Sequence, residues 1–105
     1  MPSIETLEKL IGSARDGALL RYSIGIEYVK AGDLPRAVAQ LREAVARDPA
    51  YSAAWKALGK TLEQSALPSE ALEAYRSGIE AARKKGDRQA EKEMTVFARR
   101  LERRA

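Results

Sequence analysis

The chain has 105 residues, of which 45% are hydrophobic and 32% are charged, and its formal net charge is +4. This length fits one domain, and charges of both signs spread along the chain are typical of a soluble globular protein rather than a disordered one. Cysteine and histidine are both absent, which excludes disulfides, the usual zinc sites, thiol nucleophiles and histidine general bases.

Several other classes of site are also missing from the sequence. No apolar run is long enough to cross a bilayer, and residues 1–6 lack the basic and hydrophobic parts of a signal peptide, so we expect a cytoplasmic protein that does not bind a membrane. There is no Gly-rich phosphate loop, and we expect no cofactor. Because the carboxylates are spread over solvent faces with no converging pair, we do not expect an enzyme.

The N-terminal third contains two segments with helical periodicity. The first follows Ser3, a candidate N-cap, and its apolar residues recur three or four positions apart: Ile4, Leu7, Leu10, Ile11 and Ala14. Arg15-Asp16-Gly17 is a turn signal. The second segment carries Leu20, Ile24, Tyr28 and Ala31 and ends at Gly32-Asp33.

The third helix is predicted from both its ends and its apolar stripe. Asp33 can cap it, and Pro35 lies in its first turn, where a missing N–H costs no hydrogen bond. The helix ends before Asp48-Pro49, and its stripe consists of Ala37, Val38, Leu41, Ala44 and Val45.

Three further helices are predicted over the rest of the chain. One runs from about residue 51 to 65 with Trp55, Leu58 and Leu62. The next starts near Pro68 and carries Ala71, Leu72, Tyr75, Ile79 and Ala82. The last spans about residues 88–104 with Met94, Phe97, Ala98 and Leu101. No segment alternates with period two, so the sequence predicts an all-α fold of about six helices with no strands.

The chain contains an internal repeat of 34 residues. A shift of this length places Gly25 on Gly59 and Leu41 on Tyr75, and it also superimposes four apolar pairs: Ile24 on Leu58, Ala37 on Ala71, Val38 on Leu72 and Val45 on Ile79. The shared residues are the apolar and small ones, whereas most charged positions differ. This pattern indicates one packing unit that is used twice.

The repeat resembles the tetratricopeptide family, in which a helical hairpin of 34 residues carries the pattern W-x₂-L-G-x₂-Y followed by alanine and an aromatic residue. The second unit matches through Trp55, Leu58, Gly59, Leu62, Ala71 and Tyr75. The first unit matches through Ile24, Gly25, Tyr28, Ala37, Leu41 and Ala44. The resemblance implies a stack of helical hairpins, in which the two glycines allow close approach of paired helices.

The flanking helices fit the same pattern. Met94, Phe97, Ala98 and Leu101 reproduce the opening of a repeat, and the N-terminal stripe resembles the second helix of one. We therefore expect a half-repeat at 1–17, full repeats at 18–51 and 52–85, and a capping half-repeat at 86–105.

Two departures from the family pattern stand out. Arg21 occupies the tryptophan position, where its aliphatic stem covers the site or Leu20 turns in, and no proline occurs at Arg83, so this helix should continue to Lys85.

The resemblance implies a protein-interaction module that holds a peptide or partner segment in a concave groove lined by the first helix of each repeat. The candidate groove residues are Tyr22, Ile26, Val29, Lys30, Lys56, Lys60, Lys92, Val96 and Arg99. Tyr22, Ile26 and Val29 are apolar residues off the core stripe, which favours a partner. The alternative is that the N-terminal helix or a bend in the stack covers them.

The basic candidates favour an acidic peptide or a terminal carboxylate as the ligand. Alternatively, Lys56 and Lys60 are ordinary solvated residues that Glu63 and Glu91 offset.

Two other functions stay open. The whole net charge of +4 resides in residues 52–105, which would allow nonspecific nucleic-acid binding, although no aromatic residue interleaves the arginines at 99–104 for base stacking. The second open function is self-association to a homo-oligomer through Tyr22, Ile26 and Val96.

Overall fold

A computed structural model describes residues 3–104 and contains six helices and no strand within that range. The predicted all-α fold is therefore confirmed. The helices are α1 (Ile4–Glu8), α2 (Ala18–Lys30), α3 (Leu34–Arg47), α4 (Ser52–Gln64), α5 (Pro68–Lys85) and α6 (Arg88–Arg104). Residues 1, 2 and 105, which belong to the two expected half-repeats, lie outside the described residues.

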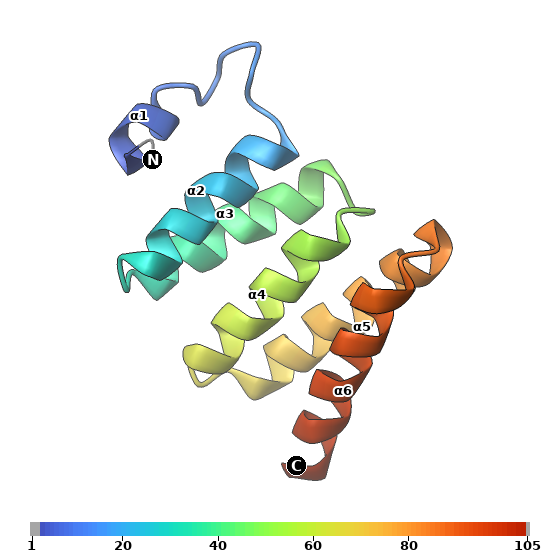
Figure 1. The fold of residues 1–105 in the computed structure, drawn as a ribbon. Helices are drawn as coiled ribbons and strands as arrows, with labels where there is room; N and C mark the ends of the chain where they lie inside the picture. Colours follow the sequence, from blue (N-terminus) through green and yellow to red (C-terminus); the bar gives the residue numbers. More distant parts are fainter. Residues whose placement is uncertain (1–2, 105) are drawn as a thin grey trace.

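The helices form a stack of hairpins, as Figure 1 shows. The closest pairings join α2 to α3, α4 to α5, and α5 to α6, while α3 also packs on α4. In Figure 1 the helices α2, α4 and α6 lie side by side toward the viewer, with α3 and α5 behind them. The result is an elongated body of 41 × 29 × 21 Å.

Local signals set the ends of the middle helices where the sequence predicts them. The side chain of Asp33 accepts a hydrogen bond from the Arg36 N–H at the start of α3, and Pro35 lies in the first turn. At the other end of the molecule, α5 continues to Lys85 and stops at Gly86, which adopts a left-handed φ of 77°. The expected extra turn of this helix is confirmed.

Two glycines set the distance between the helices of each hairpin. A Cβ added at Gly25 would lie 2.8 Å from Leu41 Cγ, and one added at Gly59 would lie 2.6 Å from Tyr75 Cδ1. Both distances are shorter than real carbon contacts, so only glycine fits without movement of the neighbour. The close approach predicted from the repeat is confirmed in both hairpins.

The core has two parts. The larger cluster runs from α3 through α6 and includes the fully buried Leu41, Leu58, Leu62, Tyr75 and Met94. The smaller cluster joins α2 and α3 to the N-terminal segment, and its members are Leu20, Ile24, Tyr28 and Ala37 with Ile4, Leu7, Leu10 and Val29 against them. The N-terminal segment therefore covers the outer side of α2.

The predicted N-terminal helix is wrong in its length. The helix α1 ends at Glu8, and residues 9–16 form turns instead of continuing to Ala14. Gly12 adopts a left-handed φ of 84°, and Ile11 is 37% exposed rather than part of the stripe. Glycine interrupts a helix easily because it has the most backbone freedom to lose, and here its N–H donates to the Asp16 carboxylate 2.9 Å away.

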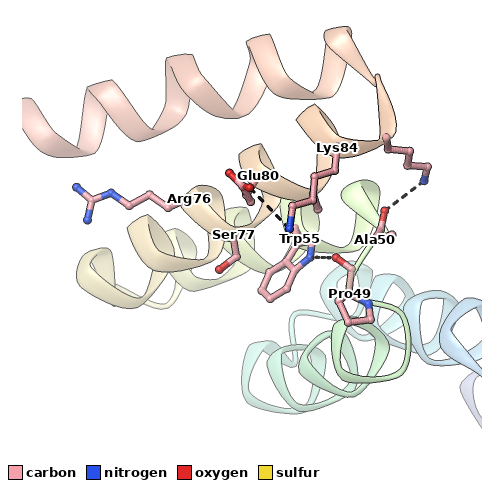
Figure 2. Close-up of a pocket in the computed structure, with 9 residues that line it drawn as sticks. Pro49, Ala50, Trp55, Arg76, Ser77, Glu80 and Lys84 are labelled. Atoms are coloured by element: carbon pink, nitrogen blue, oxygen red, sulfur yellow. Dashed lines mark hydrogen bonds and ion pairs between the residues drawn. The ribbon is translucent and has the colours of Figure 1, made fainter.

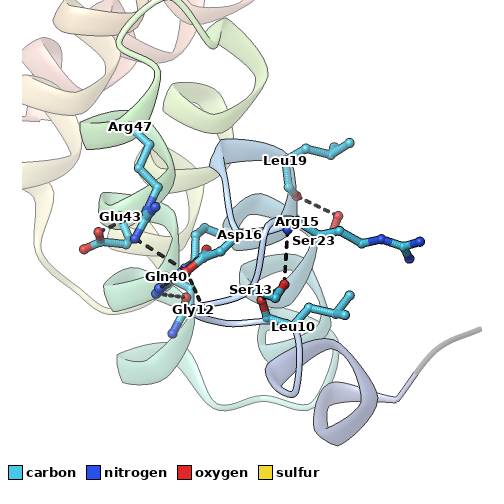
Figure 3. Close-up of polar contacts among 11 residues, drawn as sticks. Leu10, Gly12, Ser13, Arg15, Asp16, Leu19, Ser23, Gln40, Glu43 and Arg47 are labelled. Carbon is cyan, nitrogen blue, oxygen red and sulfur yellow. Dashed lines mark hydrogen bonds and ion pairs between the residues drawn. The ribbon is translucent and has the colours of Figure 1, made fainter.

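Arg21, at the tryptophan position, forms the centre of a polar network. Its Nε and Nη2 donate to the two oxygens of Asp16 at 2.9 and 3.0 Å, and its Nη1 donates to Gln40 at 3.2 Å. Arg47 adds a second cationic group, 3.7 Å from Asp16 (Figure 3). The expected alternative is also met, because Leu20 turns in and is only 8% exposed. The network ties the turn before α2 to α3 by charged hydrogen bonds, a role that the sequence does not reveal.

Candidate functional site

All nine candidate residues lie on the three helices that face the viewer in Figure 1. The helix α2 carries Tyr22, Ile26, Val29 and Lys30, the helix α4 carries Lys56 and Lys60, and the helix α6 carries Lys92, Val96 and Arg99. Their side chains differ in what they contact, and these contacts decide which of them are open to a partner.

Two of the α2 candidates pack within the molecule. The ring of Tyr22 lies 5.1 Å from the ring of Tyr51, against the larger core cluster, and Val29 packs on the cluster that includes α1. The alternative interpretation, that the stack itself covers them, therefore applies to these two residues. Ile26 is half-buried, and Lys30 is exposed and pairs with Glu27 at 3.2 Å.

The two lysines of α4 face α6. Lys56 forms an ion pair with Glu93 at 3.3 Å, and the ammonium group of Lys60 lies 5.0 Å from the centre of the Phe97 ring. The expected neighbours are different, because Glu63 accepts the Tyr75 hydroxyl at 2.8 Å and Glu91 pairs with Arg83 at 3.1 Å. Neither of these carboxylates offsets the lysines in the way the sequence suggests.

On α6, Glu93 and Phe97 contact the two lysines of α4, and Arg100 lies beside the Phe97 ring. These three residues recur four and three positions apart, so they share one face of the helix. Each lies one position after a predicted residue, namely Lys92, Val96 or Arg99, and is therefore rotated by about 100° around the axis. The three predicted residues are exposed, with Val96 at 54%, on the neighbouring face. Sequence reasoning missed Glu93 and Arg100 and assigned Phe97 to the core.

The ring of Phe97 contacts one aromatic ring and two cationic side chains. Its ring centre lies 5.5 Å from that of the buried Tyr75, and Lys60 and Arg100 lie 5.0 and 5.7 Å from it. Cations over an aromatic face are attracted by its quadrupole. Burial, together with the hydrogen bond to Glu63, raises the pKa of Tyr75 well above its ordinary value. The hydrogen bond from the Tyr75 hydroxyl to Glu63 links α5 to α4 beside the Phe97 ring.

Lys60 and Arg100 have no carboxylate partner within 4.0 Å among residues 3–104, although eleven ion pairs occur in this part of the chain. Both side chains belong to exposed residues. The surface between α4 and α6 thus presents two cations around one aromatic ring, and neither cation has a carboxylate within 4.0 Å in the described part of the chain.

Three of the surface pockets formed by residues 3–104 lie elsewhere, and none of the nine candidates lines these three. The largest, about 730 Å³, lies between the α3–α4 connection and α5, with Trp55 at its centre (Figure 2). A second of about 220 Å³ adjoins it and shares Trp55 and Ser77. A third of about 500 Å³ lies between the α4–α5 connection and the end of α6. The sequence predicts Trp55 as a core residue, but it is only partly buried.

Other kinds of site find no support in the part of the chain that the structure describes. Residues 3–104 contain no group of three or more acidic side chains placed to hold a metal ion. No helix in this range is long and apolar enough to cross a membrane.

Comparisons with known proteins agree with this geometry. Residues 22–86 match the family model described as "Tetratricopeptide repeat". A TPR repeat-containing protein of Pseudomonas aeruginosa is 47% identical over 100 residues, which is 95% of each chain. The solution structure of a Bordetella parapertussis protein is 40% identical with a TM-score of 0.81, and the match covers 99% of this chain and 90% of that one.

The crystal structure of a tetratricopeptide repeat domain protein from Salinibacter ruber is similar as well. It is 30% identical with a TM-score of 0.76, over 83% of this chain and 97% of that one. Tetratricopeptide repeats generally mediate protein–protein interactions, and proteins of the family are typically non-enzymatic scaffolds. The matched residues, the glycine-spaced hairpins and these relatives together show that the chain belongs to the tetratricopeptide repeat family.

Proposed function

We propose that the chain is a protein-interaction module that binds an acidic segment of a partner on the surface formed by α2, α4 and α6. The observation that carries this proposal is the pair of exposed cations, Lys60 and Arg100, that flank Phe97 without a carboxylate of their own among residues 3–104.

A carboxylate is the natural ligand for this arrangement. Arg100 offers a planar fork that can bind a carboxylate through two hydrogen bonds, and Lys60 adds a point charge from the neighbouring helix. The Phe97 ring between them supplies an apolar surface that excludes water from one side. A side chain of glutamate or aspartate, or the carboxyl terminus of a partner, satisfies all three groups.

The neighbouring residues extend the surface in a consistent way. Lys92 and Arg99 are exposed on α6 and add positive charge, while the exposed Val96 and the half-buried Ile26 add apolar area. Lys56 contributes less to binding because Glu93 already neutralises it. The ligand class that fits is therefore an acidic segment with interspersed apolar residues.

The test uses two blocked peptides, one of alternating glutamate and leucine and one of alternating lysine and leucine, added to the ¹⁵N-labelled chain. We expect the glutamate peptide alone to shift the amide resonances around Lys60, Phe97 and Arg100. The variant Lys60→Glu/Arg100→Glu should lose this response, and the control variant Lys84→Glu, which reverses one charge on α5, should retain it. Equal responses to both peptides, or a response that survives the double variant, would contradict the proposal.

A further inference from the structure

The outer side of α5 carries a groove that the interaction surface described above does not include. It consists of the two adjoining pockets that share Trp55 and Ser77, one of about 730 Å³ and one of about 220 Å³. Trp55 and Lys60 are five positions apart on α4, which places their side chains about 140° apart around the helix axis. The groove and the cations beside Phe97 therefore face different directions.

The centre of the groove is apolar and fixed. The indole N–H of Trp55 donates to the Pro49 carbonyl at 2.8 Å, which holds the ring in place beside Ala50 and Ala81 (Figure 2). Because its polar atom is already satisfied, the ring offers only apolar area to a ligand. Tryptophan in a preformed hollow is the residue type that most often dominates the energy of a protein interface.

The two ends of the groove carry opposite charge. Lys84 and Lys85 lie at one end with Glu80, and Glu70 and Glu73 lie at the other with Arg42. Arg76 also lines the groove, but it pairs with Glu102 of α6 at 3.3 Å. Glu73, Ser77, and Lys84 are four and seven positions apart, so they follow one stripe of α5 over about 16 Å. That distance matches about five residues of an extended chain.

The ion pairs and hydrogen bonds that these charged side chains form within the chain are weak, so they compete little with a ligand. Lys84 lies 3.8 Å from Glu80, with both side chains more than half exposed, and Lys85 donates to the Ala50 carbonyl at 3.3 Å. Glu70 pairs with the half-exposed Arg42. Glu73 has no ion-pair partner within 4.0 Å in the described part of the chain. Exposed pairs of this kind contribute little to stability, so a ligand can displace them at small cost.

We propose that this groove is a second docking site, which binds an extended segment of a partner protein with an acidic residue beside Lys84, an apolar residue against Trp55 and a basic residue beside Glu73. The Ser77 hydroxyl lies between the two charged ends and is available to the backbone of the bound segment. Complementary charge at both ends fixes the direction in which the segment lies.

Tryptophan fluorescence can measure binding at this groove, because Trp55 is the only tryptophan in the sequence. The probes are two blocked hexapeptides of the pattern Lys-Ser-Pro-Leu-Ser-Asp and its reverse order of charges, Asp-Ser-Pro-Leu-Ser-Lys, in which the charged residues are five positions apart. A third peptide has serine at both ends. We expect one charged order to produce a saturable change in tryptophan fluorescence. The serine peptide should bind at least about tenfold more weakly because it lacks both ion pairs.

Charge reversals on the exposed side of α5 test the assigned ends. Lys84→Glu and Glu73→Lys should each weaken the preferred peptide by about tenfold or more. The double variant Glu73→Lys/Lys84→Glu should bind the opposite peptide order instead. Lys60→Glu is the matched control and should leave the fluorescence response unchanged, whereas it removes part of the surface proposed for the acidic segment.

Two results would overturn this second site. One is the absence of any saturable fluorescence change with either charged peptide up to about millimolar concentration. The other is a response that neither Lys84→Glu nor Glu73→Lys alters. Both outcomes leave the amide shifts around Lys60 and Arg100 unaffected, so failure here is distinguishable from failure of the proposed function.

Discussion

Gly59 of α4 lies directly against the aromatic ring of Tyr75 of α5, so that a Cβ at position 59 would come within 2.6 Å of Tyr75 Cδ1. Gly59→Ala gains about 1 kcal/mol of helix propensity but must displace a buried ring, and overpacking of this kind costs about 1–3 kcal/mol. We expect a net loss of about 1 kcal/mol in the free energy of unfolding, measured by urea titration.

Gly25→Ala is the matched control, because it makes the same change 34 residues earlier against Leu41. An aliphatic side chain adapts more easily than a ring, so this variant should lose less stability than Gly59→Ala. Equal losses would show that the ring of Tyr75 is not what restricts position 59.

The hydroxyl of Tyr75 provides the second prediction. Tyr75→Phe removes the 2.8 Å hydrogen bond to Glu63 and should lower the free energy of unfolding by about 1 kcal/mol at neutral pH. Burial raises the pKa of Tyr75 in the folded chain. The contribution of Tyr75 to the free energy of unfolding is therefore fully present below the ordinary tyrosine pKa, and it is lost as the pH rises toward the pKa of the folded chain.

The wild-type protein should therefore lose stability above about pH 10 more steeply than Tyr75→Phe. Urea titrations of both proteins across this range measure the difference. Parallel curves would mean that Tyr75 ionises as readily in the folded chain as in the unfolded one.

Much of the fold follows from the sequence because its determinants are local or repeated. Asp33 caps the start of α3, and Gly86 ends α5 through its left-handed backbone. Both effects depend on residues within one turn. The contact between Gly25 and Leu41 is visible as a repeat, since Gly59 and Tyr75 recur at the same spacing.

The features that the sequence does not predict depend on a local turn at Gly12 or on long-range packing. The apolar period continues through Ile11, but Gly12 turns the chain and its N–H is held by Asp16. On α6, the predicted groove residues Lys92, Val96 and Arg99 each lie one position before the residues that contact the α4 lysines or the Phe97 ring. The groove beside Trp55 depends on how the α3–α4 connection packs, which periodicity does not encode.

The orientation of α6 can be tested through the ion pair of Lys56 and Glu93. These side chains are 29% and 37% exposed, so the pair contributes about 0.5 kcal/mol. Lys56→Glu should destabilise the chain by about that amount or slightly more, because it places two carboxylates together. The exchanged pair Lys56→Glu/Glu93→Lys should recover most of the loss in a double-mutant cycle.

Lys92→Glu is the control for this cycle, because it makes a charge reversal of equal size and opposite sign one position away from Glu93. We expect it to have no coupling with Lys56→Glu. Coupling of Lys56 to position 92 rather than 93 would show that α6 is rotated toward the orientation predicted from the sequence.

The network around Asp16 provides a prediction about pH. Hydrogen bonds from Arg21 and from the Gly12 N–H, with the nearby charge of Arg47, hold the pKa of Asp16 well below its ordinary value. A carboxylate with a lowered folded pKa stabilises the fold above its unfolded pKa, about 3.9, and loses that contribution as the pH falls toward the folded value. Asp16→Asn should therefore lower the melting temperature at neutral pH, and the difference from wild type should shrink progressively below pH about 4.

Asp33→Asn is the matched control for this prediction, because asparagine caps a helix as well as aspartate and Asp33 lies outside the Arg21 network. It should leave the melting temperature nearly unchanged at neutral pH.

Asp87 also has a lowered pKa, from hydrogen bonds with the Ala90 N–H and Ser52, so Asp16→Asn should keep part of the acid sensitivity. If the melting temperature of Asp16→Asn lies below that of wild type by the same amount from neutral to acid pH, Asp16 stabilises the fold through packing rather than through its charge. In that case the turn before α2 would not depend on the ion pair with Arg21.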